Sequence, residues 1–128
     1  MPHETNDAIA RSWAIQSDAS RRGFDWPDIQ GVLGKVREEL GEIEEAWGAG
    51  DRNAAQDELG DLLFATVNLA RFLDVDPAEA LGGANARFQK RFALLEAELQ
   101  STGKVMEECS LEELDEVWEW VKRSLHQE

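Results

Sequence analysis

Residues 62–70 read Leu-Leu-Phe-Ala-Thr-Val-Asn-Leu-Ala, and this stretch decides the fold that we expect. It belongs to a helical segment that runs from about residue 51 or 53 to residue 73. Apolar side chains lie almost all the way round its second half, and a helix of that kind is buried on most sides. Four other helices of one small domain could hardly cover it. The stretch therefore predicts a helical bundle that a second subunit completes.

Four more helical segments surround this one, separated by Gly, Pro and Asp clusters. A weak helix covers about residues 6–22, and a clearly amphipathic one covers about residues 28–47. Asp76-Pro77-Ala78-Glu79 begins a fourth that Gly103 closes, and the capping box at 110–113 begins a short last helix. Val and Ile are sparse and no strand-like alternation occurs. We therefore predict an all-α bundle of about five helices in one domain, residues 1–128, with its core at about 23–125.

The charge balance excludes several classes of partner. The chain has 27 acidic against 13 basic residues, a formal net charge of −14, whereas a nucleic-acid binder normally carries a basic face. The same charge disfavours an anionic membrane surface, and no run of about 18 apolar residues predicts a membrane-spanning helix. We expect no secretory signal at the start of the chain. The single Cys109 cannot form an intrachain disulfide, so we expect a reduced, cytoplasmic setting.

The acids of the second segment are unevenly spread. Glu38, Glu42 and Glu45 fall within about 60° of one another on the helix, and Glu39 lies at the edge of the apolar stripe. Like charges one turn apart repel, which destabilises a helix by a few tenths of a kcal/mol for each pair. A solvated outer face is the simplest interpretation of such a run.

Acids on the third segment favour another interpretation. Glu58 and Asp61 lie one turn apart on a helix whose later half is predicted to be buried. An unpaired buried carboxylate costs several kcal/mol, so these groups are either near water or held by a cation. If the two helices are antiparallel, Glu39 and Glu42 lie opposite Glu58 and Asp61. An all-oxygen site of this kind suits Mg²⁺ or Mn²⁺ and not Zn²⁺.

A ferritin-like di-iron site is the structural competitor in a helical bundle. That site needs Glu-x-x-His pairs on its helices. The only histidines are His3 and His126, which both lie near the chain ends. The di-iron interpretation therefore fails for lack of ligands.

The acids also form a spaced motif, EExxE at 38–42 followed by ExxD at 58–61. Other stretches in the pattern are GFDWP at 23–27, KVREEL at 35–40, ELGDLLF at 58–64, ANARF at 84–88 and RF at 91–92. Together they cover about residues 23–122, and they resemble the MazG-like nucleoside triphosphate pyrophosphohydrolases of the all-α pyrophosphatase superfamily. The chain looks most like the C-terminal of the two domains in long MazG proteins. It is then either a free-standing single-domain member or an excised domain.

The resemblance implies an enzyme that hydrolyses nucleoside triphosphates to a nucleoside monophosphate and pyrophosphate, as nucleotide-pool housecleaning. It implies a requirement for Mg²⁺, for which Mn²⁺ is a possible substitute. The metal-binding positions it indicates are Glu39, Glu42, Glu58 and Asp61. Catalytic roles fall to Glu38 and Glu39, with Glu38 in a lesser or water-orienting role.

The resemblance also assigns nucleotide-binding positions downstream. Arg87 and Arg91 match a basic pair that holds phosphate, Trp118 and Lys122 match an aromatic and basic pair, and Asn85 is a phosphate or sugar contact. Each has a structural alternative. The arginines could be surface ion-pair partners, Trp118 a core anchor and Asn85 a paired core amide.

Trp26 and Asn68 each have two possible roles. Trp26 either stacks on a base or plugs its loop, and we favour the plug. Asn68 is either a buried helix-pairing amide or a ligand contact, and the sequence does not separate the two.

Two other functions stay open at this point. One is a narrow-substrate relative that acts on dUTP, dCTP or phosphoribosyl-ATP. The other is a catalytically weak helical module that binds a nucleotide or a partner protein. The partners we expect are a nucleoside triphosphate and a second copy of the chain, as a homodimer or higher homo-oligomer, with neither nucleic acid nor membrane.

Overall fold

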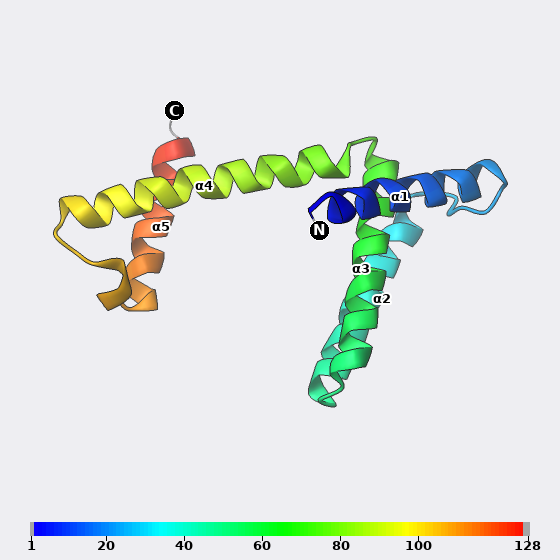
Figure 1. Cartoon of the computed structure of the whole chain (residues 1–128), viewed down its shortest axis with the longest axis horizontal. Helices are drawn as coiled ribbons and strands as arrows, with labels where there is room; N and C mark the ends of the chain where they lie inside the picture. The colour runs from blue at the N-terminus through cyan, green and yellow to red at the C-terminus, as the bar shows by residue number, and fades with distance from the viewer. Residues whose placement is uncertain (1, 127–128) are drawn as a thin grey trace. The chain divides into compact units, whose positions relative to one another are not determined.

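The structure is a computed structural model that describes residues 2–126, with side chains from residue 8 onward (Figure 1). Its α-helices and one 3-10 helix are α1 (Pro2–Arg21), α2 (Ile29–Gly48), α3 (Arg52–Leu73), α4 (Pro77–Ser101), η1 (Met106–Glu108) and α5 (Leu111–His126). No strand occurs among the described residues, which confirms the predicted all-α class. Each predicted helix is present. The short η1 was not predicted, because a segment of three residues is too short to show a helical repeat of apolar residues.

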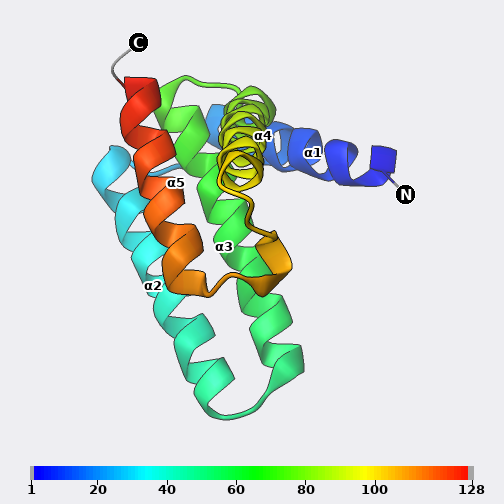
Figure 2. The same ribbon diagram turned by 90° about the vertical axis from the view of Figure 1, so that its left-hand side faces the viewer.

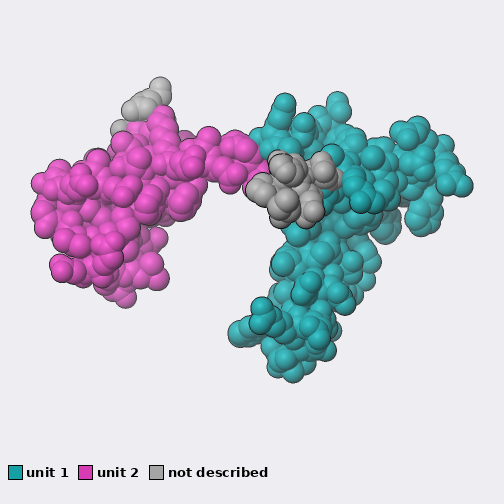
Figure 3. All heavy atoms as spheres, viewed as in Figure 1, with its two compact units in different colours: residues 1–80 teal, residues 81–128 magenta. Residues whose placement is uncertain are grey.

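The chain forms two compact units, residues 1–80 and 81–128 (Figure 3). The first holds α1, α2, α3 and the first turn of α4. The second holds the rest of α4, η1 and α5. Among the described helices, none is both long and apolar enough to cross a membrane. The prediction of one domain over residues 1–128 stays a prediction.

The first unit is built around an antiparallel hairpin of α2 and α3, which lie side by side (Figures 1 and 2). Asp28 and Asp51 cap the two helix starts, because their side chains accept hydrogen bonds from the backbone N–H groups of Gln30 and Ala54. Gly50 has φ 71° in the connection between them, which suits a residue without a Cβ. The short turn therefore fixes which face of α2 meets α3.

Helix α1 packs against α3 in the same unit. The buried Gln16 side chain donates a hydrogen bond from Nε2 to the backbone oxygen of Phe64, 3.1 Å away. This contact ties the first helix to the middle of the third.

The single chain covers α3 only in part. Ala65, Val67 and Ala70 are buried as predicted, but Leu63 is 59% exposed. On α2 the predicted apolar stripe divides in the same way. Val32 is buried there, whereas Leu40 and Trp47 are 50% and 81% exposed. These uncovered side chains are the surface that the predicted second subunit would cover.

The second unit joins α4 to α5 through apolar contacts. Leu95, Leu99 and Val121 are its buried side chains. The Phe88 ring lies 5.4 Å from that of Trp118, centroid to centroid. The predicted capping box is confirmed, since the Glu113 N–H donates to Ser110 Oγ and the Ser110 N–H donates to Glu113 Oε1.

We predict that Gly50→Ala lowers the stability of the hairpin by about 1 kcal/mol, because a Cβ is unfavourable at this left-handed backbone position. Thermal unfolding followed by helical circular dichroism measures the effect. Gly48→Ala is the matched control, because a Cβ at position 48 meets nothing within 4 Å and the residue ends a regular helix. Equal melting temperatures for the two variants would contradict the prediction.

Candidate metal centre

Carboxylates from α2 and α3 converge on one place in the first unit. Glu38, Glu39 and Glu42 form one group, and Glu39, Glu58 and Asp61 form another. Within each group, one oxygen of every carboxylate lies within 4.8 Å of the others. The structure thus brings together the acids that the sequence predicts, and Glu39 belongs to both groups. We call these five residues the acid cluster.

The cluster spans from the interior to the surface. Glu39 is only 3% exposed and Glu58 is half-buried, whereas Glu38 and Asp61 are exposed. Glu39 was predicted at the edge of an apolar stripe, and in the structure its side chain is buried beside Glu58 and Asp61 of α3. Glu45, which lies on the same helix, is exposed and belongs to neither group.

Two buried oxygens in the cluster lack a donor when the carboxylates are ionised. Among the described residues, no N–H or O–H group reaches Oε2 of Glu39 or Oε2 of Glu58 in that state. A buried charged oxygen without a partner is costly, and a bound cation would remove that cost. Because all donors are carboxylates, the site fits a hard divalent cation such as Mg²⁺ or Mn²⁺.

Lys35 supplies a positive charge at the cluster. Its Nζ lies 3.2 Å from Glu39 Oε1 and 3.4 Å from Glu38 Oε2. The hydrogen bond to Glu39 raises the pKa of Lys35, so this lysine stays protonated. In the sequence, Lys35 stands out only as part of the KVREEL stretch. Its spacing of one turn before Glu39 is the signal that would have placed it beside the acids.

The carboxylates share a proton when no cation is present. Hydrogen bonds with Glu42 and with Glu39, together with burial, raise the pKa of Glu58 to about 8. Burial also acts to raise the pKa of Glu39, but hydrogen bonds with Glu58 and Lys35 outweigh it and lower that pKa overall. Near neutral pH, Glu39 is therefore ionised while Glu58 holds the proton.

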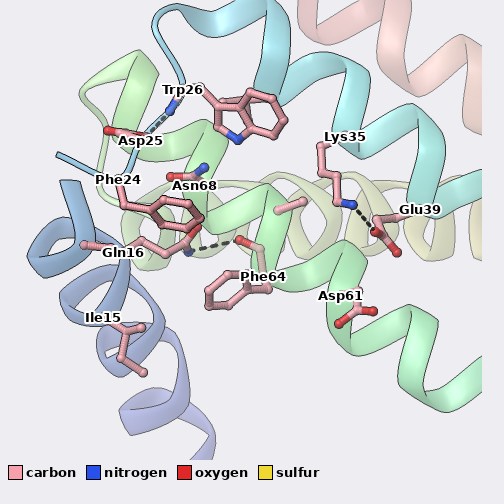
Figure 4. Close-up of a pocket in the computed structure, with 13 residues that line it drawn as sticks. Ile15, Gln16, Phe24, Asp25, Trp26, Lys35, Glu39, Asp61, Phe64 and Asn68 are labelled. Carbon is pink, nitrogen blue, oxygen red and sulfur yellow. Dashed lines mark hydrogen bonds and ion pairs between the residues drawn. The ribbon is translucent and has the colours of Figure 1, made fainter.

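A cavity of about 640 Å³ opens beside the cluster within the first unit (Figure 4). It shares Glu39, Asp61 and Lys35 with the charged site. The remainder is lined by three aromatic side chains, two amides, one carboxylate and four aliphatic side chains: Phe24, Trp26, Phe64, Gln16, Asn68, Asp25, Ile15, Ala19, Val32 and Ala65. Trp26 was predicted to plug its loop, but it is 44% exposed and forms part of the cavity wall.

The predicted nucleotide-binding residues all lie in the second unit, on α4 and α5. Arg87 is exposed and Arg91 is half-buried on α4. Lys122 pairs with Glu119 at 3.2 Å, and the Trp118 ring is half-buried beside Phe88. The assignment of these residues to the nucleotide stays a prediction.

Asn85 differs from its predicted surroundings. Its helical position placed it on the apolar face of α4, in a buried setting. The structure leaves Asn85 exposed, because the apolar residues of that face are themselves uncovered, with Leu81 54% and Phe88 56% exposed.

Comparison with known proteins identifies the family. Residues 29–92, half of the chain, match the MazG nucleotide pyrophosphohydrolase domain. The chain belongs to this family. The MazG match begins at the start of α2 and ends within α4, so it contains the whole acid cluster together with Arg87 and Arg91. The predicted family is thereby confirmed.

Individual MazG relatives extend the similarity beyond that stretch. The nucleoside triphosphate pyrophosphohydrolase/pyrophosphatase MazG of Thermotoga maritima is 46% identical over 115 residues, which cover 90% of this chain and 44% of the relative. The nucleoside triphosphate pyrophosphohydrolase of Escherichia coli is 41% identical over 118 residues, 91% of this chain and 45% of the relative. The chain thus spans less than half the length of these curated relatives.

We predict that the stabilisation of the protein by Mg²⁺ increases as the pH rises from about 6 to about 8.5. Because the pKa of Glu58 is raised from 4.5 to about 8 on folding, the metal-free fold loses stability as the pH rises from about 4.5, where the unfolded chain ionises, to about 8, where the folded group ionises. Bound metal needs the ionised form, so its effect grows with pH. Melting temperatures with and without Mg²⁺ at each pH measure both trends.

Glu58→Gln should remove this pH-dependent gain, because the uncharged side chain neither titrates nor attracts the cation as a carboxylate does. Glu45→Gln should leave it unchanged, since Glu45 lies outside both acidic groups. An Mg²⁺-induced shift that is the same at every pH would show that Glu58 is not part of the metal site.

Proposed function

We propose that the chain hydrolyses nucleoside triphosphates between the α and β phosphates and releases a nucleoside monophosphate and pyrophosphate. The observation that carries the proposal is the pair of buried, unpartnered oxygens on Glu39 and Glu58 inside the acid cluster. The named activity of the relatives from Thermotoga maritima and Escherichia coli supports it. The reaction requires a divalent cation, which we propose is Mg²⁺, with Mn²⁺ as a substitute.

Glu39, Glu42, Glu58 and Asp61 hold the cation in this proposal. A cation bound there would neutralise charge on the phosphate oxygens and acidify the attacking water. Buried Glu39 stays fixed by Lys35 at 3.2 Å, which keeps the carboxylate oriented toward the rest of the cluster. A rigid ligand set favours catalysis because it needs no rearrangement when charge develops on the α-phosphate.

Glu38 has a different role from its neighbour. It is exposed at the rim of the cluster, so water reaches its carboxylate. We assign it to orient the attacking water and to accept a proton from it as the oxygen–phosphorus bond forms. The pyrophosphate then leaves as the α–β bond breaks.

Positive groups are needed for the outer phosphates, since carboxylates repel them. Arg87 and Arg91 stand one turn apart on α4, the spacing at which two side chains lie on the same face. We propose that they hold the phosphates, with Lys122 as a third positive group. Trp118 and Asn85 would contact the nucleoside.

We predict that the purified chain with Mg²⁺ releases pyrophosphate and not orthophosphate from at least one nucleoside triphosphate. Glu39→Gln and Asp61→Asn should each lower turnover by at least about a hundredfold, because each removes charge from the metal site. Coupled assays for the two phosphate products, run over all common NTPs and dNTPs, measure this. Turnover of a single base would indicate a narrow-substrate enzyme.

Asp57→Asn is the matched control for Asp61→Asn. It removes the same charge from an exposed residue one turn away on α3, outside both acidic groups. It should keep near-normal turnover, and circular dichroism should show the same helicity for all variants. Release of orthophosphate alone, or full turnover in Glu39→Gln, would contradict the proposal.

We also propose that two copies of the chain pair through the apolar face of α3, which is uncovered at Leu63 and at Phe64, 43% exposed. Sedimentation should then give twice the mass of the 14.4 kDa chain. Leu63→Glu should yield monomers, since a charge at the centre of an apolar interface opposes association. Leu111→Glu, at an 81% exposed leucine on α5, should leave the mass unchanged. A monomer at all concentrations for the unmodified chain would refute this pairing.

A further inference from the structure

The acid cluster contains a repulsion that acts between two helices. Three of its members lie on α2 and two on α3, and one oxygen of Glu39 lies within 4.8 Å of oxygens of Glu58 and Asp61. Like charges at this distance repel each other, and more strongly where burial keeps water out. Lys35 offsets part of the charge, but both acids that it pairs with belong to its own helix. The geometry of the cluster therefore depends on what holds α2 and α3 together.

The hairpin of α2 and α3 is closed by the chain itself at one end only (Figure 2). There residues 49–51 connect the two helices, and the Asp51 N–H donates a hydrogen bond to the backbone oxygen of Ala46 at 3.0 Å. At the other end the start of α2 and the last turn of α3 have no covalent link. The acid cluster lies between these two ends. The separation of its oxygens thus depends on contacts at the open end as well as on the turn.

An ion pair at the open end ties α3 to the loop that leads into α2. Arg71 lies in the last turn of α3, with Nη2 2.6 Å and Nη1 3.2 Å from Oδ2 of Asp25. The two side chains are only 10% and 23% exposed, so salt and water screen the pair less than a surface pair. Among the described residues of the first unit, the other ion pairs join residues three or four apart on one helix. The Asp25–Arg71 pair is the one that bridges separate elements there.

Asp25 is in turn attached to α2 through Trp26. Oδ1 of Asp25 accepts a hydrogen bond from the Trp26 backbone N–H at 2.8 Å (Figure 4). The Trp26 indole lies directly on α2 at Gly31, where a Cβ would come within 2.8 Å of Trp26 Cδ2. The Asp28 side chain then caps α2, because it accepts a hydrogen bond from the Gln30 N–H. A displacement of Asp25 would therefore move the start of α2 with it.

Both partners of the ion pair are charged near neutral pH. Burial acts to raise the pKa of Asp25, but hydrogen bonds with Ser20 and with Arg71 outweigh it and lower that pKa overall. The guanidinium group of Arg71 is protonated at any pH that a protein meets. The attraction between the two groups is thus present under the conditions in which the acids of the cluster repel one another.

We propose that the Asp25–Arg71 ion pair is a clamp that positions the metal ligands of the acid cluster. The clamp holds the open end of the hairpin closed, so that Glu58 and Asp61 stay within reach of Glu39. The inference rests on the proposed function, because it takes the acid cluster as the metal site. Both residues of the clamp are positioning residues, since they act on the metal only through the helices. Without the clamp the helices move apart, and metal binding has to bring them back together, which weakens the apparent affinity.

Calorimetry with Mn²⁺ alone, without nucleotide, tests the clamp. Arg71→Gln should weaken Mn²⁺ binding by at least about fivefold, the lower end of the usual coupling between two sites. Asp25→Asn should weaken it to a similar extent, and the double variant should lose no more than either single variant, because both changes break the same ion pair. Arg71→Lys keeps the positive charge and should bind Mn²⁺ more tightly than Arg71→Gln.

Arg21→Gln is the matched control. It breaks an ion pair with Asp18 at 3.5 Å in the same unit, but both residues lie on α1 and are 71% and 59% exposed. Its Mn²⁺ affinity should equal that of the unmodified chain. Melting temperatures separate weaker binding from unfolding. At one Mn²⁺ concentration, the metal should raise the melting temperature of Arg71→Gln less than that of Arg21→Gln.

Asp25→Asn decides the test if Arg71→Gln does not fold, because its amide oxygen still accepts the hydrogen bond from the Trp26 N–H. Unchanged Mn²⁺ affinity in a folded clamp variant would overturn the clamp and leave the metal site in place. Equal losses in Arg71→Gln and Arg21→Gln would also overturn it. A chain that binds no Mn²⁺ would overturn the clamp together with the metal site. A loss confined to the clamp variants, in a chain that releases no pyrophosphate, would support the clamp and refute the proposed reaction.

Discussion

The site depends on one constraint: its buried carboxylates repel one another, and this repulsion must be offset. Glu39 and Glu58 point oxygens into a place that water does not reach and that no hydrogen-bond donor fills within the described residues. The positive charge of Lys35 offsets part of this negative charge. A proton on Glu58, whose pKa is raised to about 8, offsets another part. An arrangement that folding alone would not favour is consistent with selection for a ligand that completes it.

Helical periodicity is the reason why the fold and the acid cluster were predictable. Apolar residues at intervals of three and four predict α2 and α3, and the short turn at Gly50 forces them to be antiparallel. The spacing within EExxE and ExxD then places Glu39 opposite Glu58 without further information. Family resemblance, and not periodicity, supplied the reaction.

Other features depend on contacts between distant residues, which periodicity does not encode. The seat of Trp26 on Gly31 depends on how a loop folds back onto α2, and the sequence favoured a mere plug. Asn85 was expected in a buried setting, but the face of α4 that carries it is uncovered. Coverage of that face, as of Leu63 on α3, depends on which other surfaces pack against it. The sequence shows how apolar a helix face is, but it does not show which element or subunit packs against that face.

The short connection between α2 and α3 has a consequence for how such a protein can change over time. All members of the acid cluster fall within residues 38–61, on either side of one tight turn. Substitutions at other positions do not change the helical register of these acids, because the number of residues between them stays the same. A single residue inserted into either helix between an acid and the turn would rotate that acid by about 100° and move it along the axis by about 1.5 Å. Related proteins that retain the cluster should therefore differ in the other side chains of residues 38–61, while the length of this segment stays almost constant.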